Sequence, residues 1–558
     1  MLSRKEYITS RALRNFLAAS IMTSLAGQLA VTTDAVIVSH MIGPDAVSAI
    51  NMVMPLTMLF SCASILLGLG GSVLAAKAMG EHNGALVNRI FTVALMLLAV
   101  SGAALSLFTH AASEDIVAGI CDEARIAPMA LEYTDIITAG AFFLVMSNGM
   151  NYFVSTDGRP GLVTRGVVAG AISNIVLDIV LVAYMGIEGS AIATVVSYIV
   201  TLAVVSTHFF GKRSSYRLVN PMKGFGGYVG RNVYEGLPLM LGNLFLGGAV
   251  FAINSMILSA AGADGIYIWT VCMQILMMTF VVLNGVGNAM LSIGSVLVGE
   301  KDYRGVHMLT MLSLRLVCGS LALLVVLLLL FPQAISFIFG ATGSGIEIEN
   351  PLRIFSLLLI PFAVTLVMRF LFQILEYRML SLLLSVGQLV GIVLCLWLFT
   401  TYAPETLWWS FPASALVLVT LQLAATTIMC IGKKGVSAIT LIPDADADSS
   451  SLDMSVEYDA ESISGALVRI EKFLAGKNIA MFKEHCKEIM QELASDAAGK
   501  CRCFDIHVRI LEGEVHMVLR DVGKRLEPQR LLAKIDGVEC KYMYGQNVVF
   551  LKRTIVRV

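Results

Sequence analysis

Three polar residues, Asp34, Asn174 and Asp178, lie deep inside apolar segments of the chain. Inserting a carboxylate at the depth of a bilayer costs about 2.5–3.5 kcal/mol of free energy on insertion scales, so such a residue is seldom retained without a partner or a function. Gly166, Gly170, Asn174 and Asp178 are each four residues apart, which puts them on one face of a helix. Because glycines let another helix approach closely, that face should pack against protein and not against lipid.

These residue types suit the binding of a small cation. If Asp34 meets the face that carries Asn174 and Asp178, two carboxylates and an amide oxygen converge, and Thr194 could add a hydroxyl. Hard oxygen donors are suited to a cation such as Na⁺, and two neighbouring carboxylates could instead share a proton. Sodium and proton coupling are both left open. The alternative is that Asn174 and Asp178 only join helices through hydrogen bonds.

The composition is that of a protein embedded in lipid. Hydrophobic residues make up 57% of the 558 residues, charged residues only 14%, and the mean hydropathy is +0.80, far from an ordinary soluble domain. About 20 residues of helix cross a bilayer. The chain therefore predicts an all-α polytopic membrane protein of twelve transmembrane helices, near residues 14–40, 47–77, 90–110, 131–154, 162–184, 188–210, 232–260, 266–298, 308–331, 351–376, 379–399 and 407–431.

The loops predict the orientation. Most of their lysines and arginines fall on one side, whereas the opposite loops carry little beyond Arg125. The positive-inside rule then predicts a plasma (inner) membrane protein with both termini in the cytoplasm. The first apolar run lacks a small-residue cleavage site, so we expect a retained helix. The ten cysteines are scattered and imply no disulfide framework.

An internal repeat divides the membrane part into two lobes. Gly43–Val47 lines up with Gly262–Ile266, and Gly80-Glu81 lines up with Gly299-Glu300, both at an offset of 219 residues (262 − 43 and 299 − 80). Six helices in each half, repeated in parallel, suit alternating access about a central cavity. We expect an N-lobe over 1–215 and a C-lobe over 216–434.

Several of these segments resemble the multidrug and toxic compound extrusion (MATE) family of antiporters. The resemblance extends over about residues 10–431 and is strongest in the first half. It rests on Thr33–Val38, Met41–Ala46, Leu67–Ser72, Ala78–Glu81, Thr156–Pro160, Asn174–Asp178 and Gly186–Thr194.

The resemblance implies a role for the buried polar residues. It places ion coupling in the N-lobe, at Asp34, Asn174, Asp178 and Thr194. The counterpart of Asp34 at the 219-residue offset is Ile253, so the coupling site is predicted in the N-lobe alone.

Other polar residues of the membrane part have weaker assignments. Asn148 and Asn151 in the fourth helix could line the cavity and contact substrate, or only pack helices. Glu235 is expected at a solvated helix end. Arg315 and Arg369 are the only basic candidates for a cavity, and Arg369 stands in the tenth helix, where family members with C-lobe coupling would carry an acid.

The tail is a second domain. An acidic linker over 435–454 leads to a small soluble α/β (α+β sandwich) region over 455–558. Phe504–Ile510 and Val515–Leu519, separated by Gly513, predict a hairpin; 480–498 predicts a helix and 547–552 a final strand. No metal site is predicted here, because Cys501 and Cys503 lack zinc-finger spacing.

The tail resembles the ATPase fold of histidine kinases and anti-sigma factors in a degenerate form. That resemblance assigns Glu492, Asp521 and Gly523 to a nucleotide site, with Asp496 where asparagine is expected. The glycine-rich lid is missing. We therefore expect no cofactor and no hydrolysis, and a regulatory or partner-binding role, with a cytoplasmic protein as the partner.

The predicted function is secondary active antiport, not enzymatic catalysis. The transporter would export organic, often cationic, amphiphilic compounds in exchange for Na⁺ or H⁺, with membrane lipid around it and no nucleic acid partner. Two alternatives are a lipid-linked oligosaccharide flippase, which would need basic residues deep in its cavity, and a membrane sensor that signals through the tail.

Overall fold

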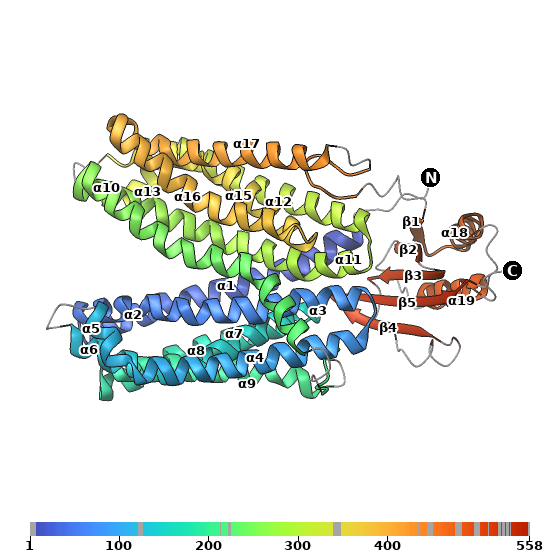
Figure 1. Ribbon diagram of the computed structural model, residues 1–558, viewed down its shortest axis with the longest axis horizontal. Coiled ribbons are helices and arrows are strands. Elements are labelled where there is room, and N and C mark those ends of the chain that lie inside the picture. Colours follow the sequence, from blue (N-terminus) through green and yellow to red (C-terminus); the bar gives the residue numbers. More distant parts are fainter. Residues whose placement is uncertain are drawn as a thin grey trace.

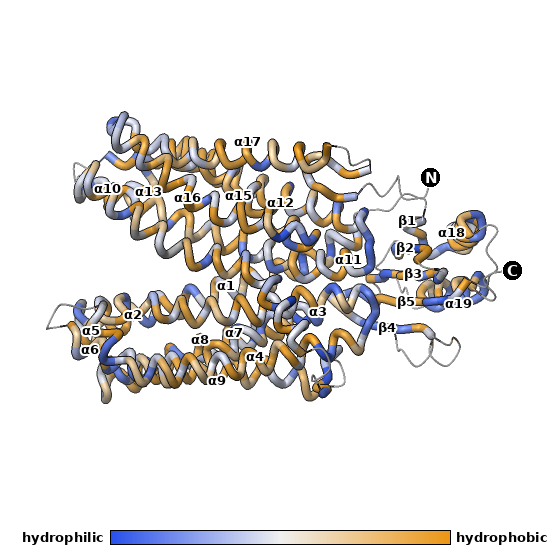
Figure 2. Tube along the Cα trace, in the orientation of Figure 1, coloured by the Kyte–Doolittle hydropathy of each residue, from blue (hydrophilic) through white to orange (hydrophobic). Residues whose placement is uncertain are grey.

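The computed structural model describes residues 7–120, 126–211, 214–220, 225–338, 347–431, 435–443, 450–474, 482–495, 503–511, 513–522, 526, 531, 535 and 537–555. Figure 1 shows two bundles of long helices side by side, with a small sheet domain at one end of both. We call this the domain end. In Figure 2, hydrophilic segments gather at the two ends of the bundles and in the small domain, while the helices between them are mostly hydrophobic.

The twelve predicted spans are present. Eleven helical stretches among the described residues are long and apolar enough to cross a membrane, and the pair α6–α7, bent by 53°, makes up to twelve. The N-lobe contains α1 (Tyr7–Met41), α2 (Pro44–Ala63), η1 (Ser64–Leu69), α3 (Gly70–Gly80), α4 (Gly84–Ala111), α5 (Ser113–Ile120), α6 (Ala127–Ala139), α7 (Ala141–Thr156), α8 (Pro160–Met185) and α9 (Ile187–Phe210).

The C-lobe follows the same plan. It contains α10 (Phe225–Ala289), η2 (Met290–Gly294), α11 (Ser295–Gly299), α12 (Tyr303–Leu330), α13 (Pro332–Ile338), α14 (Glu349–Ser356), α15 (Leu359–Ile374), α16 (Arg378–Tyr402), η3 (Pro404–Trp409) and α17 (Ser410–Cys430). The 65-residue α10 is two spans, because Gly262 breaks it with a φ of 63°, a conformation that glycine adopts without strain.

The repeat is visible in backbone geometry. α4 and α12 each have 28 residues, and their bounds differ by 219 at both ends. Each is preceded by a residue of positive φ, His82 (53°) and Lys301 (57°). Each is then capped at its N-terminus by a side-chain oxygen, of Asn83 and of Asp302.

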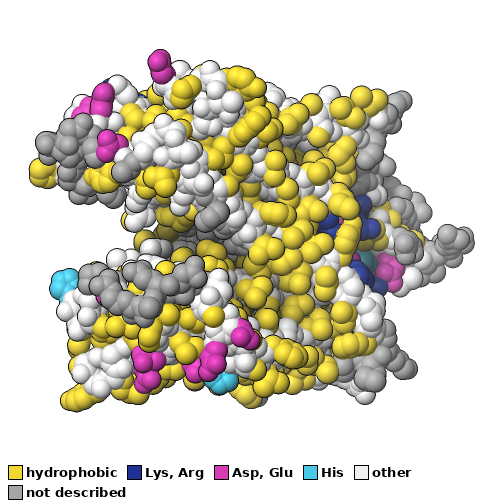
Figure 3. Space-filling view, turned by 60° about the vertical axis from the view of Figure 1, so that its left-hand side comes forward, with side chains coloured by type: hydrophobic (Ala, Val, Ile, Leu, Met, Phe, Trp, Pro, Cys, Tyr) yellow, Lys and Arg dark blue, Asp and Glu magenta, His cyan; other side chains and the backbone are white. Residues whose placement is uncertain are grey.

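The two lobes touch through glycines at the domain end. A Cβ on Gly299 would lie 2.1 Å from the carbonyl oxygen of Lys77 and 3.0 Å from the Cα of Gly80, and a Cβ on Gly80 would lie 2.1 Å from the carbonyl oxygen of Val296. Only hydrogen fits at either position, so α3 and α11 meet backbone to backbone. At the opposite end the lobes diverge, and Figure 3 shows a hollow between them there.

The C-terminal domain is a five-stranded antiparallel sheet with two helices. Its strands β1 (Ser451–Glu457), β2 (Cys503–Leu511), β3 (Glu514–Asp521), β4 (Val538–Met543) and β5 (Gln546–Thr554) lie in the order β1-β2-β3-β5-β4. The helices are α18 (Ala460–Phe473) and α19 (Phe482–Ser495). The predicted hairpin, helix and final strand correspond to β2–β3, α19 and β5. β1 begins inside the segment predicted as linker, and the likeness to an ATPase fold stays a prediction.

The two faces of this sheet have different neighbours. Because side chains alternate along a strand, Phe504 and Ile506 of β2 point into the core formed with α18 and α19. Asp505 and His507, on the opposite face, are also buried, and His507 lies near Asp302 of the membrane part. The domain is therefore docked onto the bundles.

We expect Gly299→Ala to weaken the contact between the lobes. The new methyl group would overlap the Lys77 carbonyl, and overpacking of this kind costs about 1–3 kcal/mol. Gly319→Ala is the matched control, because nothing lies within 4 Å of its Cβ position. Thermal unfolding in detergent should show a lower melting temperature for Gly299→Ala alone; equal values for the two variants would contradict the tight contact.

Candidate functional site

The polar face of α8 is buried against α9. Gly166, Gly170, Asn174 and Asp178 are all buried, and the Cβ positions of the two glycines point at Thr201 of α9. The Thr201 hydroxyl donates to the Gly166 carbonyl at 3.2 Å. The glycine contacts bring α8 and α9 close together. One turn beyond Gly170 the same face carries the amide of Asn174, and two turns beyond it the carboxylate of Asp178.

Asp34 of α1 reaches this face. The carboxyl groups of Asp34 and Asp178 are close enough to share a hydrogen if one of them is protonated. The Ser190 hydroxyl of α9 donates to Asp34 at 2.8 Å. Asp178 is fully buried, and no other polar group of the described residues hydrogen-bonds its two oxygens.

Two further hydroxyl groups surround the pair. Thr194, one turn beyond Ser190 on α9, lies beside the phenol of Tyr133 on α6, and Tyr133 lies near Asp34, Asp178 and Tyr198. Sequence reasoning did not assign Ser190, Tyr133 or Tyr198 to the site. The spacing of four residues between Ser190 and Thr194 is the one signal that could have included Ser190.

This arrangement requires a positive charge. Two carboxylates side by side in a low-dielectric site repel each other, and a buried charge without a partner costs several kcal/mol. A shared proton or a small cation relieves the repulsion, and the nearby hydroxyl groups are hard oxygen donors of the kind that such a cation uses. The residue types at this site therefore suit the binding of a proton or a small cation.

Two cavities lie elsewhere in the membrane part, and Asp34, Asn174, Asp178 and Thr194 are not among the described residues that line them. The smaller, of about 160 Å³, is lined by Asn148 and Asn151 of α7 together with Ser72 and Asn288. The larger, of about 470 Å³, is lined mainly by α10, α15 and α16, and Arg369 is the one charged residue among the described residues of its lining. Ser24, Leu69, Tyr152 and Asn288 line both.

A cluster of ion pairs around the buried Glu235 lies at the domain end, and Lys77 joins the lobes through it. Lys77 of α3 contacts Glu235 of α10 at 3.0 Å and Glu376 at 3.2 Å, and Arg378 contacts Glu235 at 2.5 Å. The expectation of a solvated helix end is wrong for Glu235, whose side chain is 0% exposed. The sequence could not reveal its partners, because Lys77 is 158 residues away.

The C-terminal domain binds the C-lobe through charge. Arg520 of β3 forms ion pairs with Glu300 and Asp302, in the turn before α12. Arg509 of β2 donates to the Lys301 carbonyl at 2.8 Å. All three C-lobe residues belong to one turn, which is the repeat counterpart of the turn at His82.

The same domain binds the N-lobe through its β4–β5 edge. The Tyr544 hydroxyl donates to the Thr156 carbonyl at 2.6 Å, and the Gln546 amide donates to the Ile8 carbonyl at 2.8 Å. The His82 ring stacks on Phe550 at 3.5 Å. One rigid sheet therefore spans the closed ends of both lobes.

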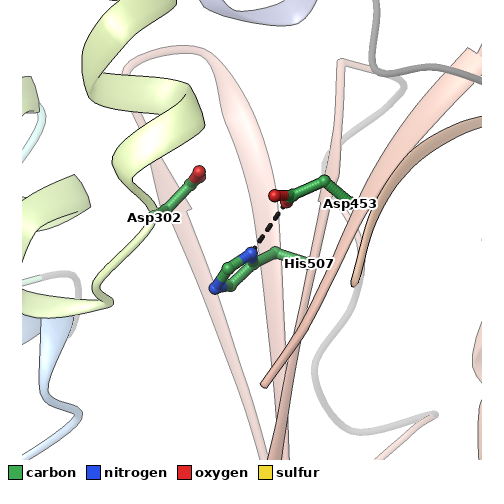
Figure 4. Close-up of side chains that lie close together, drawn as sticks. All are labelled: Asp302, Asp453 and His507. Atoms are coloured by element: carbon green, nitrogen blue, oxygen red, sulfur yellow. Dashed lines mark hydrogen bonds and ion pairs between the residues drawn. The ribbon is translucent and has the colours of Figure 1, made fainter. Parts of the chain in front are cut away.

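Three potential metal ligands also meet at this interface. Figure 4 shows Asp302 of the membrane part beside Asp453 of β1 and His507 of β2, with donor atoms within 4.8 Å of one another. His507 Nδ1 lies 2.8 Å from an Asp453 oxygen. Because Arg520 already neutralises Asp302, we assign this group to the interface.

The residues of the predicted nucleotide site are only partly described. Glu492 lies on α19. Asp521, at the end of β3, accepts hydrogen bonds from the Tyr458 hydroxyl and the Asn547 amide. Asp496 and Gly523 lie outside the described residues, so nucleotide binding stays a prediction.

Comparisons with known proteins agree with this fold. Residues 19–180 match the family model MatE. An outward-facing multidrug resistance MATE family transporter of the MOP superfamily is 21% identical, with a TM-score of 0.68 over 74% of this chain and 94% of that one. A MATE crystal structure in the bent conformation is 21% identical, with a TM-score of 0.69 over 75% and 96%. No curated protein matches the chain.

A further solved structure has the same fold. It is a MOP superfamily transporter from Pyrococcus furiosus that is 21% identical, with a TM-score of 0.68 over 78% of this chain and 100% of that one. That transporter is described as having a binding pocket of reverse polarity, which suggests a different function for it. The chain is thus a multi-pass membrane protein with the two-lobe fold of MATE transporters. The segment matched by the MatE model holds both Asp34 and Asp178.

We expect acid to weaken the docking of the C-terminal domain. Burial lowers the pKa of His82 below its usual 6.5, and Glu539 only partly offsets this; Lys541 and His516 lower it further. Because the pKa of His82 is lower when the domain is docked, protonation of His82 favours the undocked state. The contribution of His82 to docking is therefore present at high pH and is lost as pH falls below 6.5. Hydrogen exchange of β5, corrected for the intrinsic effect of pH, should accelerate between about pH 7.5 and about pH 5.5.

The control is His82→Phe, which keeps a ring against Phe550 and removes the titrating group. It should reduce the pH dependence, while His110→Phe, at the opposite end of α4, should not. An unchanged pH dependence in His82→Phe would contradict this assignment.

Proposed function

We propose that this protein is a secondary active antiporter that exports organic amphiphiles in exchange for Na⁺ or H⁺. The observation that carries the proposal is the contact between Asp34 and Asp178 inside the N-lobe. A buried pair of carboxylates that lacks a cation among its protein neighbours gains one from solution, and its occupancy is then set by the ion gradient. The larger cavity supplies a separate place for the organic substrate.

The shape of the molecule supports alternating access. The lobes are in contact at the domain end and diverge at the other, as expected for an outward-facing state. In the cycle that we propose, a cation enters from outside and joins Asp34 and Asp178, the N-lobe helices rearrange, and the substrate leaves outward. The domain end, with both termini, then faces the cytoplasm of a cell whose inner membrane holds the protein.

We expect Asp34→Asn and Asp178→Asn to abolish gradient-driven export. Each variant removes one of the two charges that hold the cation, whereas the amide keeps the shape of the side chain. The measurement is export of a fluorescent organic dye from proteoliposomes, with sodium and proton gradients imposed separately. The gradient that drives export identifies the coupling ion.

Asp264→Asn serves as the control, since Asp264 is exposed at the start of the second half of α10. It should transport normally. Full activity of both N-lobe variants would overturn the coupling site. Absence of wild-type transport under either gradient would favour the flippase or the sensor.

We also propose that the C-terminal domain regulates transport by holding the domain end closed. It contacts Glu300 and Asp302 of the C-lobe and Thr156 and Ile8 of the N-lobe. Inward opening must separate these residues, so the domain has to release at least one lobe first. A cytoplasmic partner that binds the same face of the sheet would activate transport.

We expect Arg520→Gln to accelerate transport. Removal of one partner from a buried ion pair costs about 3–5 kcal/mol, and here it leaves Glu300 and Asp302 without the guanidinium that neutralises them. The export rate should rise, and the amides of β2 and β3 should exchange faster. Arg469→Gln, on α18, is the control. A rate equal to that of wild type, with the faster exchange present, would contradict the regulatory role.

A further inference from the structure

The larger cavity holds the guanidinium of Arg369, which has no ion-pair partner among the described residues and lies 5.1 Å from the centroid of the Phe370 ring. Arg369 of α15 lines the cavity, and the one side-chain acceptor that reaches the guanidinium is the Ser385 hydroxyl, 3.3 Å from Nη1. Its Nε is buried without a hydrogen-bond partner, and none of the ion pairs among the described residues includes it. A guanidinium has five N–H donors, so most of its hydrogen-bonding capacity is unused.

A second unsatisfied donor lines the same cavity. Gln388 of α16 is 7% exposed, and its Nε2 is buried without a partner. Buried donors are nearly always satisfied in native proteins. Two such donors on facing helices, one of them charged, indicate that the acceptor comes from a ligand.

The rest of the lining suits an apolar body. Trp269, Met273, Phe280 and Phe362 lie around the cavity. A volume of about 470 Å³ is that of a site for a drug-sized molecule, much larger than an inorganic ion needs. No acidic residue is found in this lining, so a cation would meet Arg369 without a counter-charge.

We propose that the larger cavity binds an amphiphilic organic anion, with its carboxylate, sulfonate or phosphate group on Arg369 and Gln388 and its apolar body among the aromatic residues. Arginine binds planar oxyanions through two parallel hydrogen bonds. The two lobes then bind opposite charges. Acidic residues in the N-lobe bind the driving cation, and a basic residue in the C-lobe binds the anionic substrate. The sequence prediction of often cationic substrates would be wrong for this site.

This inference rests on the proposed function in one respect, because it takes the bound anion to be the exported substrate. Binding of the anion can be measured without transport. The experiment is equilibrium binding to the full chain in nanodiscs, with two rigid bicyclic probes of permanent charge, naphthalene-2-sulfonate and N-methylquinolinium. Wild type should bind the sulfonate at least about tenfold more tightly, since hydrogen bonds to charged groups are stronger than those between neutral groups.

Arg369→Gln should remove that preference, and Arg369→Lys, which keeps the charge but not the two parallel donors, should retain part of it. Arg315→Gln, an exposed arginine of α12 outside the cavity, should bind like wild type. Equal binding of the two probes by wild type overturns the proposal even if a variant fails to fold. Inorganic sulfate that binds as tightly as the naphthalene probe overturns the organic class.

The outcomes separate the two proposals. Anion binding that depends on Arg369, without gradient-driven export, supports this inference and removes the antiporter. Gradient-driven export of a cationic dye, without anion binding, supports the antiporter and overturns this inference.

Discussion

The backbone contact between Gly80 and Gly299 determines the form of the whole molecule. It joins equivalent positions of the two repeats, so the lobes meet at matching places in their helix plans. No side chain larger than hydrogen fits there. The ion pairs of Lys77 with Glu235 and Glu376 lie beside it. Because the lobes are held at this end, they separate toward the other. A sheet docked across the same end adds a second connection between the lobes.

Charge is distributed unequally between two lobes that share one backbone plan. The N-lobe carries Asp34 and Asp178 in mutual contact, whereas the C-lobe has Ile253 at the position equivalent to Asp34 and Arg369 in its cavity. The repeat gives both lobes the same helix plan, and in our proposal the differences in charge between them separate the ion site from the substrate site. The lobes thus differ in charge although α4 and α12 have the same length and equivalent bounds.

Much of the architecture could be predicted from local pattern. Twelve apolar runs predicted twelve spans, because span length is set by bilayer thickness, and the β2–β3 hairpin was predicted because side chains alternate and Gly513 marks a turn. The partners of Glu235 and Arg520 could not be predicted, since they lie 158 and 220 residues away and depend on tertiary packing. β1 was missed because its polar face, which docks on the membrane helices, reads as part of an acidic linker.

The central claim is that the domain end must open for transport. The direct measurement is the distance between spin labels at Ala85 of α4 and His307 of α12, exposed positions near the domain ends of the two lobes, in the full chain in nanodiscs. We predict one short distance at rest and a second, longer population when Na⁺ concentration or pH is changed, with no such response in Asp178→Asn. A single unchanged distance under every condition, in a preparation that transports, would contradict alternating access through this end.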